Sequence, residues 1–221
     1  LIQDGFNSVT FGNSNTGNVD VTSVTFTDRT SINGRNITYG TIDATGNALA
    51  MGASGVIRQN AAGSVTAASL DLTALNQAAD ADAIGTSTDR LNIDIAGSVD
   101  ARAPGGGNIW LTSPGDITVG AISTSDYVTI DAGTGGTGAV IDGNGVDMNI
   151  TAQRTYLTAV DGIGADNNPF EINSGSLYVT NTGTGDIYIA EANDVTIAQA
   201  SNQDGDIDIV ASTNLTLADG L

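Results

Sequence analysis

The residues of this chain that could do chemistry are acidic side chains in short glycine-rich segments. The segment DGNGVD places Asp142, Asn144 and Asp147 close together in the chain. Because calcium binds carboxylate, amide and carbonyl oxygens, these three residues are a candidate calcium site, and calcium is the only cofactor that the sequence suggests. However, the consensus calcium-binding loop and the tandem glycine-rich calcium repeat are absent. Asp and Asn before Gly also serve tight turns, so the structural interpretation is favoured.

Pairs of carboxylates and arginines could instead belong to an enzyme that cuts polysaccharides. The candidates are Asp89 with Arg90, Asp100 with Arg102, and Arg154. A glycoside hydrolase needs two carboxylates across a cleft, about 5 to 9 Å apart. With no His, Cys or Lys in the chain, acid-base chemistry is left to Asp, Glu and Tyr. The spacing of the segments is nearly uniform, which leaves no insertion to build a substrate groove, so we expect no catalytic activity and no catalytic residues.

Two aromatic residues occupy equivalent places in a long internal repeat. They are Trp110 in NIWLT and Tyr188 in DIYIA, and each lies between two aliphatic residues. In a strand, alternation would turn both rings outward if the aliphatic neighbours point inward. A row of exposed aromatic rings is a candidate ligand-binding stripe for glycans or a protein partner. The alternative, which we favour, is that the rings cover an edge of the fold.

The elements that must position these residues are short strands that recur at a fixed spacing. The strand position of Ile187 recurs at Ile207, and that of Val195 recurs at Leu215. A period of about 20 residues is too short for a helical repeat and predicts stacked units of β-structure. We therefore expect an all-β parallel β-helix, or β-solenoid, with about 20 residues per turn and about 11 turns.

The composition agrees with many short strands and tight turns. The chain contains 29 glycines and only 3 prolines, and its apolar residues fall in short alternating runs. The one segment with helical propensity, residues 67–83, is interpreted as another turn of the coil because Leu70 and Leu72 alternate with polar residues, with a short helix as the alternative.

A longer repeat is superimposed on the short one. The segment that begins at Ile84 resembles the segment that begins at Ile163. Four turns of about 20 residues would account for the offset between them, so the long repeat is expected to hold a whole number of turns. The chain is expected to be a single domain over residues 1–221, with long repeats at about 84–162 and 163–221, the second incomplete. Its start at Leu1 suggests a piece of a longer protein.

Three of these segments carry a resemblance to a known family. They are DGIGADNNPFEINSGSLYVTNTGTGDIYIAEANDVTIAQ from Asp161, AIGTSTDRLNIDIAGSVDARAPGGGNIWLT from Ala83, and the terminal GDIDIVASTNLTLADG. They are similar to the repeats of filamentous-haemagglutinin-like bacterial surface adhesins. The resemblance implies a right-handed parallel β-helix, secretion to the bacterial surface, and a structural or adhesive role. The Asn-Pro-Asn-type secretion motif of that family is absent, so the resemblance is to the shaft.

Charge and missing residue types exclude several partners. Six arginines and 25 acidic residues give a formal net charge of −19. This charge disfavours nucleic acid and anionic membranes as partners. No run of eighteen apolar residues is present, so no membrane insertion is expected. The chain has no cysteine, which excludes a disulfide scaffold but is compatible with an extracellular location.

The sequence therefore predicts a non-catalytic structural module of a bacterial surface adhesin or extracellular filament. Its expected location is extracellular or on the bacterial cell surface. Its expected partners are neighbouring repeats of the same parent chain or stacked copies of itself, together with glycans of a host or cell surface. The alternatives are a polysaccharide lyase or hydrolase built on a β-helix, and a calcium-dependent carbohydrate-binding module.

Overall fold

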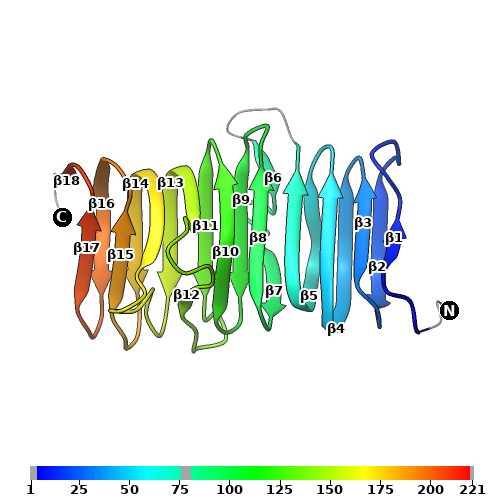
Figure 1. The fold of residues 1–221 in the computed structure, drawn as a ribbon, viewed down its shortest axis with the longest axis horizontal. Helices are drawn as coiled ribbons and strands as arrows, with labels where there is room; N and C mark the ends of the chain where they lie inside the picture. The colour runs from blue at the N-terminus through cyan, green and yellow to red at the C-terminus, as the bar shows by residue number, and fades with distance from the viewer. Residues whose placement is uncertain (1–3, 76–80, 220–221) are drawn as a thin grey trace.

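A computed structural model describes residues 4–75 and 81–219, which form strands and turns without a helix. Consequently, no helix in these residues is long and apolar enough to span a membrane. The structure assigns 18 strands along the chain (Figure 1). Their bounds are β1 Val9–Phe11, β2 Val19–Thr25, β3 Thr30–Gly34, β4 Ile37–Ala53, β5 Ile57–Ala74, β6 Asp82–Ile84, β7 Leu91–Ile95, β8 Ser98–Ala103, β9 Asn108–Ser113, β10 Ile117–Thr124, β11 Tyr127–Ala132, β12 Val140–Asp142, β13 Ile150–Ala159, β14 Phe170–Asn181, β15 Ile187–Glu191, β16 Val195–Asn202, β17 Ile207–Ala211 and β18 Leu215–Leu217.

The strands stack in parallel as a β-solenoid of about ten turns, with partner strands roughly 21 residues apart. The predicted fold class is therefore confirmed. Figure 1 shows an elongated molecule whose colours follow the chain order along the long axis, with β1 near one end and β18 at the other. The positions that recur in the sequence are strand partners in the structure: Ile187 pairs with Ile207, and Val195 pairs with Leu215. Of the segment 67–83, residues 67–74 belong to β5, which confirms the strand interpretation there, whereas residues 76–80 lie outside the described residues.

Each turn contributes to two stacks of strands. The first stack contains β9, β11, the C-terminal halves of β13 and β14, and then β16 and β18. The second stack contains β8, β10, the N-terminal halves of β13 and β14, and then β15 and β17. Strands such as β7, with apolar residues at every second position, bury those residues between the stacks and turn the polar ones outward.

The core is a continuous set of aligned aliphatic columns. Ile57, Ile84, Ile109 and Val128 follow one another through consecutive turns, and all four side chains are fully buried. Burial of each such side chain contributes about 1.5 to 3 kcal/mol. Because every turn covers the apolar face of the next, no turn can bury its own core alone.

The turns differ in length, contrary to the uniform spacing expected from the sequence. In an early turn, Val19 pairs with Ile37 of the next turn. In a later turn, Ile57 pairs with Ile84, which is a clearly longer stretch of chain. The turn from Val128 to Thr155 is equally long. In the first of these longer turns the extra residues lie between β5 and β6, and in the second they lie between β11 and β13. A separate insertion lies between β6 and β7, because Ile84 pairs with Ile109 and Leu91 pairs with Leu111. The periodicity near the C-terminus is regular, but the middle of the solenoid carries longer connections.

The long repeat does not hold a whole number of turns, so that expectation was wrong. Ile84 pairs with Ile109 in the first stack, whereas its sequence counterpart Ile163 bridges to Ile187 in the second stack. Both stacks are built from the same strand-and-turn unit, so an equivalent sequence can occupy either stack. The local geometry is nevertheless shared, because Gly85 and Gly164 both have positive φ, at 67° and 63°.

Candidate functional site

A polar groove lies on the side of the solenoid where the longer connections meet. It has a volume of about 490 Å³ and is open to solvent. Its lining comes from four places in the chain that the stacking brings together: Gln59, Ser87, Thr88, Asp89, Arg90, Asn92, Thr112, Pro114, Thr134 and Gly135. The sequence interpretation missed this groove because it assumed turns of equal length.

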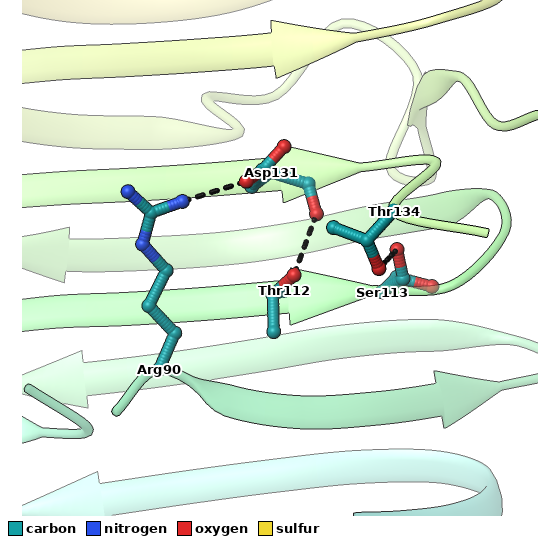
Figure 2. Close-up of polar contacts among 5 residues, drawn as sticks. All are labelled: Arg90, Thr112, Ser113, Asp131 and Thr134. Atoms are coloured by element: carbon teal, nitrogen blue, oxygen red, sulfur yellow. Dashed lines mark hydrogen bonds and ion pairs between the residues drawn. The ribbon is translucent and has the colours of Figure 1, made fainter. Parts of the chain in front are cut away.

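An ion pair crosses the groove region between two turns. Arg90 Nη1 lies 2.7 Å from Asp131 Oδ2, and the two side chains are 33% and 27% exposed (Figure 2). The hydroxyl of Thr112 donates to the carbonyl oxygen of Asp131 at 3.2 Å. In the next connection, the hydroxyl of Thr134 donates to the carbonyl oxygen of Ser113 at 3.1 Å. Side chains from three turns are thus tied to one another at the groove.

Gln59 fixes the other wall of the groove. Its Nε2 donates to Asp89 Oδ1 at 2.8 Å, and its Oε1 accepts the backbone N–H of Asn92 at 2.7 Å. Tyr39 pairs with Gln59 in the sheet register and is fully buried. Burial raises the pKa of Tyr39 well above its usual range, with a further contribution from the charge of Asp89. The phenol is therefore neutral. The charged residues that line the groove are Asp89 and Arg90, and Asp131 is paired with Arg90.

The other two arginine candidates lie away from this groove. Asp100 Oδ1 accepts the backbone N–H of Ala121 at 2.8 Å and so supports the second stack. Arg102 is an exposed residue of β8 in the same stack. Arg154 lies in the first stack, 5.0 Å from the centroid of the Tyr127 ring. Only the Asp89 and Arg90 pair from the sequence lines the groove.

Trp110 and Tyr188 do not form one row of aromatic rings. Trp110 lies in the first stack and Tyr188 in the second, because their repeats occupy different stacks. Both are half-buried. The indole Nε1 of Trp110 donates to Asp82 Oδ1 at 2.6 Å, and the hydroxyl of Tyr188 donates to Asp186 Oδ2 at 3.3 Å. Burial first, and then the charge of Asp186, raise the pKa of Tyr188.

A different aromatic row runs along the first stack. The rings of Tyr156 and Tyr178 are stacked with centroids 4.4 Å apart, and Tyr127 meets Tyr156 edge-on at 6.4 Å. Tyr156 and Tyr178 are direct register partners in adjacent turns. Because the stacked faces lie against each other along the solenoid, this row stabilises the register. The sequence contains a sign of this row, because Tyr156 and Tyr178 are one turn apart. That spacing could be recognised only once the true turn length was known.

The candidate calcium residues form a hydrogen-bonded turn. Asp142 Oδ1 accepts the backbone N–H of Asn144 at 2.9 Å, and Oδ2 accepts that of Gly145 at 3.1 Å. Asp147 is exposed. Within residues 4–75 and 81–219, no group of three or more Asp, Glu, His or Cys side chains is arranged to hold a metal ion. Asp142 and Asn144 thus belong to a turn that the side chain of Asp142 holds.

A buried polar cluster lies beneath this turn. The side-chain amide of Asn149 donates to Asp142 Oδ1 at 2.7 Å, and its oxygen accepts the backbone N–H of Glu171 at 2.8 Å. Glu171 is only 9% exposed, and its Oε2 has no hydrogen-bond partner. Burial, and then the charge of Asp142, raise the pKa of Glu171. The carboxyl groups of Asp142 and Glu171 thus belong to one buried cluster, which the sequence did not indicate.

No protein-family model, no curated protein and no solved structure matches this chain.

Proposed function

We propose that this protein is a non-catalytic structural module of a bacterial surface adhesin or extracellular filament, which acts as a stiff acidic rod. The observation that supports this role most strongly is the parallel pairing that continues from β1 to β18 around one aliphatic core. Such a solenoid is held by hydrogen bonds along its whole length, which makes it rigid without disulfides.

The two ends of the solenoid present apolar surface. At one end, an apolar groove of about 320 Å³ is lined by Phe11, Val19, Asp20, Val21, Val24, Phe26 and Ile32. At the other end, Leu215 and Leu217 of β18 are 41% and 65% exposed. The strand edges at each end can accept another parallel strand. These features support stacking of further turns on each end, either from neighbouring repeats of the same parent chain or from another copy.

Charge distribution supports a head-to-tail arrangement over contact between like ends. No lysine or arginine follows Arg154, whereas Arg29 and Arg35 lie in the first turns. Two C-terminal ends would bring acidic turns together, whereas a head-to-tail contact places the acidic end on the first turns, where Arg29 and Arg35 offset most of the charge of Asp4, Asp20 and Asp28. A contact of this kind does not close and produces a filament.

Sedimentation velocity over a range of concentrations tests this role. We expect association that grows with concentration, with elongated particles in electron micrographs. Leu217→Asp should abolish the association because it places a charge at the apolar end. Val146→Asp is the matched control, since Val146 is 91% exposed in a side turn and should not affect association. A compact or strictly monomeric species at high concentration would contradict the proposal.

A further inference from the structure

We propose that the groove around Arg90 binds a segment of neutral polysaccharide. This inference is independent of stacking at the ends, because the groove lies on the side of the solenoid. Its volume of about 490 Å³ is in the range of ligand-binding sites, about 300 to 1,000 Å³. It is an open groove, which suits a chain that passes through.

The groove runs along the axis of the solenoid. Gln59, Asn92, Thr112 and Thr134 belong to four successive turns of the first stack or to the connection that follows it. Since turns are about 4.8 Å apart, these residues span about 14 Å. The lining is therefore arranged for an extended ligand longer than one sugar ring.

The chemistry of the lining matches sugar hydroxyls, which both donate and accept hydrogen bonds. Asn92 supplies an amide, Thr112 and Thr134 supply hydroxyls, and Asp89 supplies a carboxylate. Arg90 carries five N–H donors on a guanidinium, and a third of its side chain is exposed while Nη1 is anchored on Asp131. Gln59 and Arg90 are thus held in place before a ligand arrives, which reduces the entropy lost on binding.

The charge of the groove selects against anionic ligands. Two carboxylates, of Asp89 and Asp131, lie beside the single guanidinium of Arg90. The chain as a whole also carries a net charge of −19. Uronate, sulfate and phosphate groups would therefore be repelled, whereas neutral sugars meet no electrostatic repulsion.

The test is affinity electrophoresis of the whole chain through gels that contain hydroxyethylcellulose, galactomannan or dextran, with polygalacturonate as the anionic comparison. At least one of the three neutral polysaccharides should retard the protein, and polygalacturonate should not. Arg90→Gln and Asn92→Ala should each weaken the retardation about tenfold, the loss expected when one or two hydrogen bonds to the ligand are removed. Arg102→Gln is the matched control, because it removes the same charge from the second stack and should change nothing.

Circular dichroism and thermal melting of the variants show whether they remain folded. Binding to none of the three neutral polysaccharides would overturn the inference. Retardation that Arg90→Gln and Asn92→Ala leave unchanged would overturn it as well, as would stronger binding to polygalacturonate. If reducing ends were released from a bound neutral polysaccharide, the groove would be supported as a saccharide site, and the non-catalytic role proposed above would be wrong.

Discussion

Replacing Gly164 by alanine is expected to destabilise the protein by at least about 3 kcal/mol. Gly164 has a φ of 63°, which is unfavourable for a residue with a Cβ atom. An added Cβ would also lie 2.8 Å from the backbone nitrogen of Phe170 and still closer to the carbonyl oxygen of Tyr188. Both contacts are with backbone, which cannot move without breaking the pairing of β14 and β15. Urea unfolding followed by circular dichroism measures the loss.

Gly145→Ala separates the two causes. Gly145 also has a positive φ, of 76°, but a Cβ there would meet no atom within 4 Å. Its substitution should therefore cost only the conformational energy, about 1 to 2 kcal/mol. Equal losses for Gly145→Ala and Gly164→Ala would contradict the close approach of adjacent turns at Gly164.

Glu171→Gln is expected to stabilise the protein by about 1 kcal/mol at pH 7. Burial raises the pKa of Glu171 above its ordinary value of 4.5, so the folded state binds its proton more tightly than the unfolded state. The stability of the natural protein therefore falls as the pH rises from about 4.5 through the folded-state pKa. The variant lacks this loss, so its advantage should grow as the pH rises above 4.5 and should disappear below pH 4.5. Unfolding midpoints across this pH range measure it.

Glu191→Gln is the matched control, and its effect should have the opposite sign. Glu191 is also buried, and burial raises its pKa. However, its Oε2 accepts the backbone N–H of Ser174 at 3.0 Å, and its Oε1 accepts that of Asn193 at 3.1 Å. A glutamine has only one acceptor oxygen, so one buried N–H would lose its partner at a cost of about 1 to 3 kcal/mol. If both variants changed stability in the same direction at pH 7, the interpretation of Glu171 would be wrong.

The fold class could be predicted from the sequence because the signal is local. In the last turns, apolar alternation within strands and the recurrence of Ile187 at Ile207, one turn later, follow directly from the geometry of the pairing. The column of Ile57, Ile84, Ile109 and Val128 was not readable in this way, because its members are unevenly spaced in the chain.

The groove could not be predicted, because it depends on the register between distant turns. Arg90 and Asp131 are far apart in the chain, and only the longer turns in the middle place them side by side. The same cause separates Trp110 from Tyr188. Their sequences are equivalent, but the length of chain between them determines which stack each one joins. A repeat in sequence therefore predicts local geometry, as at Gly85 and Gly164. It does not predict in which stack of the solenoid the repeated residues lie.

The most direct test of the continuous parallel coil uses the absence of cysteine in the chain. Cysteines introduced in pairs can therefore be labelled with nitroxides without interference. One pair replaces Thr158 and Thr180, which are register partners in adjacent turns, and the other replaces Thr158 and Ser201, which are two turns apart. Continuous-wave electron paramagnetic resonance should show strong spin–spin broadening for the first pair, about 4.8 Å apart, and weaker broadening for the second, at about twice that distance. A spectrum without broadening for Thr158 and Thr180 would contradict the solenoid.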